Sequence, residues 1–345
     1  MDLLRLDRAL GPLLSVLGLV VVAVVLALVV LFGGIYMVVF HMPGQSYHGT
    51  PPPLAGEEEA LRDRLREHVR VLSHQIGERH YWEPDNQLNA AVYIEQTFRN
   101  AGYEPVRHAV QTHDRVFDNI EVTLRGDRRQ DESLVIGAHY DTVRGSPGAD
   151  DNASGVAVLL ELARLLHDAK PDRTIRLVAF ANEEAPFFGT PAMGSLNYAR
   201  QARAHSENIV GMISLEMLGY YTGERDSQHY PPLLGYLYPD TGNFVAFVGN
   251  TASRQLVRDA IEAFREHAMV PSEGLAAPEL LEAIRRSDHW AFWEMGYPAM
   301  MLTDTANFRN PNYHVPSDTY QTLDYEVMAR VTAALAQAVE DMARQ

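Results

Sequence analysis

The feature that most constrains this chain is an uncharged stretch near its start. Ala9 to Phe40 contains no Asp, Glu, Lys or Arg, and Leu13 to Leu31 is almost continuous leucine and valine. A helix of about 20 apolar residues spans a bilayer, whereas the apolar region of a signal peptide is typically about 7–15 residues. The length of the stretch favours a retained transmembrane signal anchor within residues 1–40, with a signal peptide as the alternative.

The charges around this stretch predict its orientation. Arg5 and Arg8 precede it, and no Lys or Arg follows until Arg62. The positive-inside bias then places the N-terminus in the cytoplasm. We expect a single-pass protein of the bacterial inner membrane, with a Pro-rich linker at 41–55 and an extracytoplasmic, periplasmic domain at 56–345.

Composition removes several kinds of chemistry. The 345 residues include no cysteine, which excludes a thiol nucleophile, an iron–sulfur cluster and any disulfide. The formal net charge is -16, from 45 acidic and 29 basic residues. Because phosphate binding needs a clustered positive field, this balance argues against a nucleic-acid partner and leaves cation binding open.

Short apolar runs alternate with helical patterns in the rest of the chain. Buried strands that alternate with helices predict an α/β fold with a mostly parallel central sheet and helices on both faces. In such sheets the ligand lies beyond the carboxyl ends of the strands. The predicted helices are 57–76, 88–101 and 156–166, and the predicted strands are 134–138, 174–181, 209–215 and 299–302.

Histidine or acidic residues follow three of these runs. His139 and Asp141 come after the first, Glu183 and Glu184 after the second, and Glu216 after the third. Each alone is more simply a cap or a solvated turn residue. Adjacent carboxylates at the end of a buried strand repel one another unless a cation holds them.

Two further clusters complete the pattern. Asp150 and Asp151 immediately precede a helix, where they could also act as N-caps, and His314 lies in an Asn/Pro-rich loop after the last strand. With cysteine absent, these histidines and carboxylates form a nitrogen and oxygen ligand set. Such a set suits zinc and, less well, manganese or cobalt.

The order of these motifs resembles the co-catalytic di-zinc aminopeptidases of the secreted bacterial leucyl-aminopeptidase type. That superfamily is shared with glutaminyl cyclases and glutamate carboxypeptidases. The resemblance covers roughly Glu57 to the C-terminus. The segments that carry it are His139-x-Asp141, Gly148-Ala149-Asp150-Asp151-Asn152-Ala153-Ser154-Gly155, Asn182-Glu183-Glu184, Glu216, Ser287-Asp288-His289 and His314.

The resemblance implies two zinc ions bridged by Asp150. Glu184 and His314 would complete one site, and His139 and Glu216 the other. It also implies a cis peptide between Asp150 and its neighbour Asp151. The metal ligands implied in this way are His139, Asp150, Glu184, Glu216 and His314.

Three residues receive catalytic roles from the same resemblance. Asp141 would hold the second ring N–H of His139 without touching metal, and Glu183 would act as the general base. Many secreted members have Asp at the position of Glu216. A tyrosine of the secreted type is replaced by Ile284, so Ser287 or another loop would supply the oxyanion donor.

The sequence therefore predicts a membrane-anchored zinc exopeptidase that removes N-terminal residues from peptides. Its partners would be peptide substrates and, through the N-terminal helix, the lipid bilayer. The alternatives are a one-zinc glutaminyl cyclase, a carboxypeptidase, or a non-catalytic receptor-like ectodomain that has lost ligands. Six apolar residues are candidates for a substrate pocket or for the core: Phe187, Phe188, Met193, Tyr220, Tyr221 and Phe244.

Overall fold

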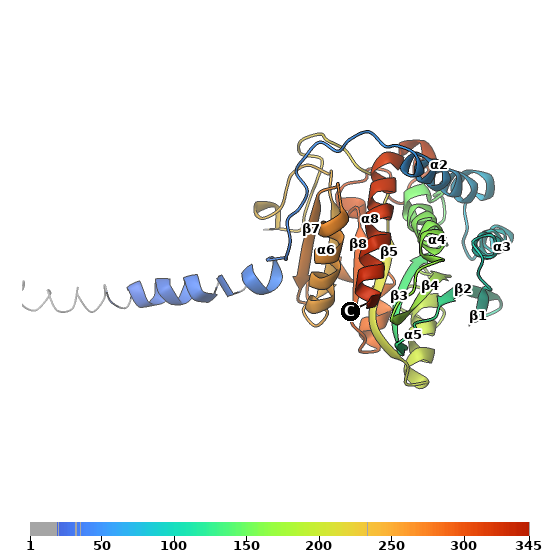
Figure 1. The fold of residues 1–345 in the computed structure, drawn as a ribbon, viewed down its shortest axis with the longest axis horizontal. Helices are drawn as coiled ribbons and strands as arrows, with labels where there is room; N and C mark the ends of the chain where they lie inside the picture. The colour runs from blue at the N-terminus through green and yellow to red at the C-terminus, as the bar shows by residue number, and fades with distance from the viewer. Residues whose placement is uncertain (1–18, 20, 32, 35, 233, 345) are drawn as a thin grey trace, which may run out of the picture. The chain divides into compact units, whose positions relative to one another are not determined.

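A computed structural model describes residues 19, 21–31, 33–34, 36–232 and 234–344 of the chain (Figure 1). The chain divides into two compact units, Met1–His41 and Met42–Gln345.

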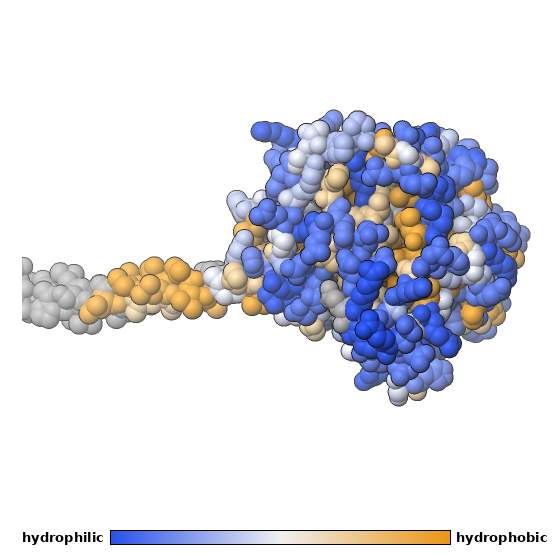
Figure 2. Space-filling view, in the orientation of Figure 1, coloured by the Kyte–Doolittle hydropathy of each residue, from blue (hydrophilic) through white to orange (hydrophobic). Residues whose placement is uncertain are grey.

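The described part of the first unit is largely an apolar helix. Its segment Val21–Val39 has a mean hydropathy of 2.9 and is long enough to cross a bilayer, although a signal sequence has the same properties. Figure 2 shows the apolar side chains, in orange, along this helix. Arg5 and Arg8, on which the predicted orientation depends, lie outside the described residues. The apolar helix is confirmed, and its role as an anchor and its orientation stay predictions.

The second unit is built on one eight-stranded sheet with the order β1-β2-β4-β3-β5-β8-β6-β7. Its central strands β4, β3, β5 and β8 are parallel, whereas β1, β2 and the β6/β7 pair introduce antiparallel contacts. The bounds are β1 Val106–Gln111, β2 Val116–Leu124, β3 Arg129–His139, β4 Arg173–Phe180, β5 Asn208–Glu216, β6 Val245–Asn250, β7 Ser272–Ala277 and β8 Ala299–Thr303.

Helices cover both faces of this sheet. The helices α4, α6 and α8 lie on one face, with α2 packed on α4 and α8, and α5 and α7 lie on the other (Figure 1). The bounds are α2 Glu57–Arg70, α3 Pro84–Asn100, α4 Gly155–Leu166, α5 Gly194–Ala204, α6 Arg254–His267, α7 His289–Glu294 and α8 Tyr325–Arg344. Along α8, Val331, Leu335 and Val339 recur every fourth residue and are buried, as a core-facing stripe requires. The predicted α/β class, mostly parallel sheet and two-sided helical cover are confirmed.

The segment predicted as a linker is bound to the second unit. Met42 and Leu54 are buried in the hydrophobic core. The carbonyl of Pro43 accepts a hydrogen bond from Arg265 Nη1 at 2.8 Å, and the carbonyl of Pro52 accepts one from Arg330 Nη2 at 2.5 Å. From Met42 onward the Pro-rich segment is therefore a strap along the surface. We call residues 42–54 the strap.

Candidate metal centre

The carboxyl ends of the parallel strands bring the predicted ligand types together. His139 is the last residue of β3, and Glu216 is the last residue of β5. Glu184 follows β4, and His314 lies in the loop after β8. Because β4, β3, β5 and β8 are parallel neighbours, these ends share one edge of the sheet.

Asp151 lies between the two histidines. Its Oδ1 is 3.4 Å from His139 Nε2, and its Oδ2 is 3.0 Å from His314 Nε2. His139 Nε2 is also 3.4 Å from Glu216 Oε2, and His314 Nε2 is 3.4 Å from Glu184 Oε1. Two donor atoms on one tetrahedral zinc ion, each about 2.0–2.1 Å from it, lie about 3.4 Å apart. The separations therefore match two ligand groups that share one carboxylate.

The prediction that Asp150 bridges these groups is wrong. The carboxylate of Asp150 accepts hydrogen bonds from the Gly219 N–H at 2.8 Å and from Asn310 Nδ2 at 2.6 Å. Donors from two other loops therefore engage both of its oxygens. The cis peptide also lies one bond later than predicted, between Asp151 and Asn152. Spacing cannot separate two adjacent aspartates, and the backbone of the turn determines which one faces the histidines.

Hydrogen bonds fix the turn that carries Asp151. Asp318 accepts the backbone N–H groups of Asp150, at 2.9 Å, and of Asp151, at 3.2 Å. Asn152 donates to the carbonyl of Leu215 at 2.8 Å and accepts the Met217 N–H at 3.1 Å. The turn is thus tied to the end of β5, where Glu216 projects.

A buried guanidinium connects this turn to β3. Arg79 is fully buried and donates to the backbone carbonyls of Tyr140, at 2.8 Å, and Gly148, at 3.0 Å. Its other hydrogen bonds go to the carbonyls of Leu72, Gly77 and Pro147. Burial lowers the pKa of Arg79 to about 10, against Asp141 and other aspartates that raise it. The sequence pattern did not single out this residue, because a lone arginine in a loop carries no spacing signal.

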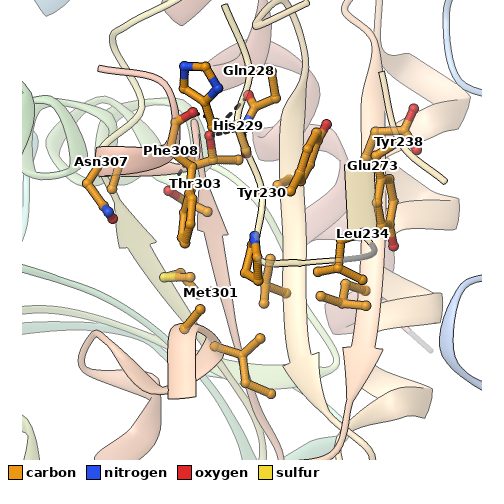
Figure 3. Close-up of a pocket in the computed structure, with 18 of the residues that line it drawn as sticks. Gln228, His229, Tyr230, Leu234, Tyr238, Glu273, Met301, Thr303, Asn307 and Phe308 are labelled. Atoms are coloured by element: carbon orange, nitrogen blue, oxygen red, sulfur yellow. Dashed lines mark hydrogen bonds between the residues drawn. The ribbon is translucent and has the colours of Figure 1, made fainter. Parts of the chain in front are cut away.

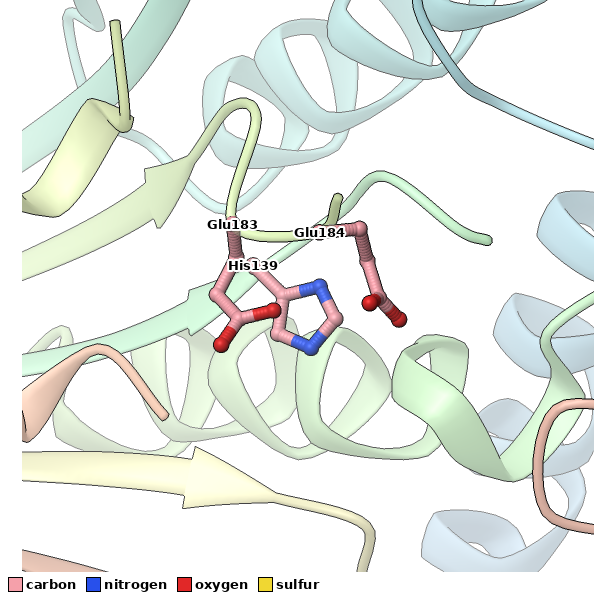
Figure 4. Close-up of side chains that lie close together, drawn as sticks. All are labelled: His139, Glu183 and Glu184. Atoms are coloured by element: carbon pink, nitrogen blue, oxygen red, sulfur yellow. The ribbon is translucent and has the colours of Figure 1, made fainter. Parts of the chain in front are cut away.

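Asp141 positions the loop after β4. Its two oxygens accept the backbone N–H groups of Glu183 and Glu184, each at 3.0 Å, and its Oδ1 lies 3.5 Å from His139 Nδ1. Figure 4 shows the carboxylates of Glu183 and Glu184 on opposite sides of the His139 ring. One aspartate thereby sets the placement of both glutamates beside the imidazole.

The buried carboxylates of the cluster would be stabilised by a positive charge. Burial raises the pKa of Glu184 to about 7, with Asp151 adding to the shift and His314 opposing it. Burial also raises the pKa of Glu183 well above its usual value, against the influence of His139. The pKa of His314 is raised to about 10, because the adjacent carboxylates of Asp151 and Glu184 outweigh burial. Crowded buried carboxylates of this kind are stabilised by a bound cation.

An unsatisfied atom in the cluster also fits a metal ion. Glu184 Oε1 is buried and has no hydrogen-bond partner among the described residues. Groups of histidine and carboxylate atoms that could hold an ion combine His139, Asp151 and Glu216, or Asp151, Glu184 and His314. Nitrogen and oxygen donors in such groups suit zinc.

The predicted oxyanion donor Ser287 has a different contact. Ser287 is fully buried, donates a hydrogen bond to Glu216 Oε2 at 2.7 Å and shares another with Ser214. Its hydroxyl therefore orients Glu216 and is not directed at a substrate. Ile284, which stands where the resemblance expects a tyrosine, is buried.

Tyr313 was missed by sequence reasoning. Its ring stacks on the His314 imidazole with centroids 3.7 Å apart. Burial raises the pKa of Tyr313, and the carboxylates of Asp151 and Glu184 raise it further, so the phenol keeps its proton beside the cluster. The only available signal was its place next to a predicted ligand.

Comparison with known proteins identifies the family of this chain. Residues 119–339 match the model of peptidase family M28. The chain is 36% identical over 318 residues to the uncharacterized protein YfbL of Escherichia coli, covering 89% of this chain and 95% of YfbL.

Solved structures show the same fold at low sequence identity. The zinc aminopeptidase BSAP of Bacillus subtilis aligns with a TM-score of 0.64 and 14% identity, covering 82% of this chain and 95% of BSAP. The glutaminyl cyclase of Fimbriiglobus ruber aligns with a TM-score of 0.57 and 20% identity, covering 87% of this chain and 99% of the cyclase. The family match spans more than half of the chain, and the chain therefore belongs to peptidase family M28.

Proposed function

We propose that this chain is a zinc-dependent aminopeptidase that holds two ions and removes N-terminal residues from peptides. The observation that carries the proposal is the placement of Asp151, whose two oxygens face two different histidines. A single carboxylate placed in this way suits a bridge between two ions. The likeness to a zinc aminopeptidase fold supports the same reading.

Each ion would have its own ligands beside the shared carboxylate. His139 and Glu216 would complete one site, and Glu184 and His314 the other, with Asp151 common to both. What zinc supplies when bound is a water of lowered pKa and polarisation of the scissile carbonyl.

Glu183 would act as the general base. Its carboxylate lies close to His139 and Glu184 but belongs to neither of the two groups that share Asp151. Burial raises the pKa of this carboxylate above its usual range, which makes it a stronger base for taking a proton from water and delivering it to the leaving amine. Asp141 holds the backbone N–H of Glu183 and so fixes the loop from which this carboxylate projects.

Tyr313 is our candidate for the donor that stabilises the developing oxyanion, in place of Ser287. Its phenol stays protonated beside the carboxylate cluster and lines the adjoining cavity. Tyr313→Phe should lower kcat about 10–100-fold with zinc content unchanged, because it removes one hydrogen-bond donor. Zinc analysis and steady-state kinetics check this, with Tyr236→Phe, at an exposed tyrosine, as the control. An unchanged kcat would reject the assignment.

The decisive experiment uses the full chain in detergent, loaded with zinc. We expect about two zinc ions per chain, release of p-nitroaniline from aminoacyl p-nitroanilides, and no release from their N-acetylated forms. One zinc ion with cyclisation of N-terminal glutamine would show a cyclase. Release of C-terminal residues would show a carboxypeptidase, and zinc-free, inactive protein would indicate a binding ectodomain.

The proposal includes a membrane location for the catalytic unit. The helix Val21–Val39 supports an anchor, and the arginines before it support an extracytoplasmic domain. Alkaline carbonate should leave the full chain in the membrane fraction. An active C-terminal fusion to a reporter that works only in the cytoplasm would contradict the orientation.

A further inference from the structure

A cavity of about 120 Å³ adjoins the candidate metal centre, and its lining includes Glu216 and Tyr313. Side chains of β8, β6 and β7 form one wall, and the loop containing Tyr230 and Leu234 lies across from them (Figure 3). Of the six apolar residues that the sequence offered for a pocket, only Phe244 is in this lining. The cavity therefore belongs to a part of the fold that the motifs did not reveal.

Strand register places four residues of the cavity in one row across the sheet. Glu216 of β5 pairs with Thr303 of β8, Thr303 pairs with Ala246 of β6, and Ala246 pairs with Glu273 of β7. Directly paired residues project from the same face of a sheet. The row consequently runs from a candidate metal ligand to a second carboxylate on the edge strand.

The neighbouring residues confirm which face Glu273 occupies. A side chain at Gly274 would meet Met42 and Ile261, so position 274 faces the strap and α6. Because successive strand residues alternate between faces, Glu273 and Leu275 face the cavity. Leu275 pairs with Val248, and Val248 pairs with Met301, so a second, apolar row lies beside the first.

The distance from Glu216 to Glu273 along this row limits the length of a ligand that could lie between them. Three strand-to-strand steps of about 4.8 Å separate Glu216 from Glu273, a span of about 14 Å. A lysine side chain extends about 6 Å from its Cα to its ammonium on a four-carbon stem. A hydrogen bond to Glu273 takes up about 3 Å more. Of the span of about 14 Å, about 5 Å then remain for the scissile group beside Glu216.

Glu273 has no hydrogen bond or ion pair with any described residue and is only partly exposed. Arg265 and His48 lower its pKa, but burial outweighs them and raises it. The guanidinium of Arg265 is engaged by Ser272 and the carbonyl of Pro43. Arg286, the one Lys or Arg among the described lining residues, is exposed and adjoins Ser287, at the Glu216 end. Glu273 is thus a carboxylate without a partner at the far end of a largely apolar channel.

We propose that this cavity receives the side chain of the substrate's N-terminal residue and selects lysine or arginine through Glu273. The inference rests on the proposed aminopeptidase function and names its substrate class. The apolar rows suit the methylene stem of such a side chain, and the carboxylate suits its cationic end. The acidic net charge of the chain favours the approach of cationic peptides.

The test compares lysyl, arginyl and norleucyl p-nitroanilides on the zinc-loaded full chain. Norleucine has the same stem as lysine without the ammonium, so the pair isolates the charge. We expect wild-type kcat/KM to be about 10–100-fold higher for lysyl than for norleucyl substrate, as for a partly buried charge pair. Glu273→Gln should remove this preference while leaving the norleucyl value within about twofold.

A matched control and a binding measurement complete the design. Glu262→Gln, at an exposed glutamate of α6, should keep the lysyl preference. Lysinamide should raise the melting temperature of the wild type more than norleucinamide does, and the difference should vanish in Glu273→Gln. Equal loss of lysyl and norleucyl turnover in Glu273→Gln, or a wild type that prefers norleucine, would overturn this inference alone. No release from any substrate would overturn the aminopeptidase proposal and this inference with it.

Discussion

The sheet has two halves that contribute functional residues in different ways. We call β3, β4 and β5 its first side and β8, β6 and β7 its second side. Around β3, β4 and β5 most candidate ligands lie in short motifs at or just after the ends of parallel strands. Around β8, β6 and β7 the cavity is built from single residues of separate strands, and β6 and β7 run antiparallel to β8. Most candidate ligands can thus be recognised from short motifs at strand ends, whereas the groups proposed to select the substrate meet only through strand register.

The largest effect should come from the shared carboxylate on the first side. Asp151→Asn should lose zinc and lower activity by more than about 10³-fold, because both ligand groups contain this residue. Asp150→Asn should retain zinc and lose about 1–3 kcal/mol of stability, since its new amide opposes Asn310 Nδ2. Zinc analysis, kinetics and denaturant unfolding separate the two. Zinc loss in Asp150→Asn alone would restore the original prediction for Asp150.

The adjacent glutamates should separate base from ligand. Glu183→Gln should keep zinc and lower kcat about 10²–10⁴-fold, because it removes only the proton acceptor. Glu184→Gln should lose zinc together with activity. The substitutions are identical in size and adjacent in sequence, so each is the control for the other. If Glu183→Gln loses the metal while Glu184→Gln retains it, the two roles are reversed, and full activity in both would reject the mechanism.

A change on the second side should alter selectivity and spare the metal. Ala246 lies in the middle of the cross-sheet row, so Ala246→Leu should shorten the channel. We expect kcat/KM to fall about tenfold for lysyl p-nitroanilide and less than about twofold for the alanyl substrate, with zinc content unchanged. An equal fall for both substrates would show that the channel does not hold the N-terminal side chain.

The smallest effect on activity concerns the scaffold beneath the first side, where the change is in stability. Burial raises the pKa of Glu161 on α4, but hydrogen bonds from His68, Arg164 and Arg64 outweigh it and lower the pKa to about 2. A depressed folded-state pKa stabilises the protein above about pH 4.5, and this stability is lost as the pH falls toward 2. Glu161→Gln should cost about 3 kcal/mol at pH 7 and about half of that or less at pH 3. Denaturant unfolding at both pH values checks this, and a pH-independent difference would contradict it.

The same division explains what the sequence could predict. The alternation of apolar runs and helices predicted the fold class, and the residues after the runs included His139, Glu184, Glu216 and His314, which the structure brings together around Asp151. Two adjacent aspartates look alike in sequence, and only the backbone of the turn distinguishes them.

The sequence patterns of the second side predicted its strands and its cavity less well. The strand β7 reads Ser-Glu-Gly-Leu-Ala-Ala, which has neither a β-branched run nor clear alternation, and it was not predicted. The pairing of Ala246 with Glu273 depends on the order and direction of strands far apart in the chain. Such register is a tertiary property that no local motif contains.

The strap limits where proteases can cleave this protein. Hydrogen bonds to Arg265, Ser272 and Arg330 hold its backbone or side chains against α6, β7 and α8, which protects it from proteases. Proteolytic cleavage before Met42 would release the second unit with its sheet, its candidate ligands and its cavity intact. One cleavage there would therefore separate the two units, and the new N-terminus would lie at or before Met42.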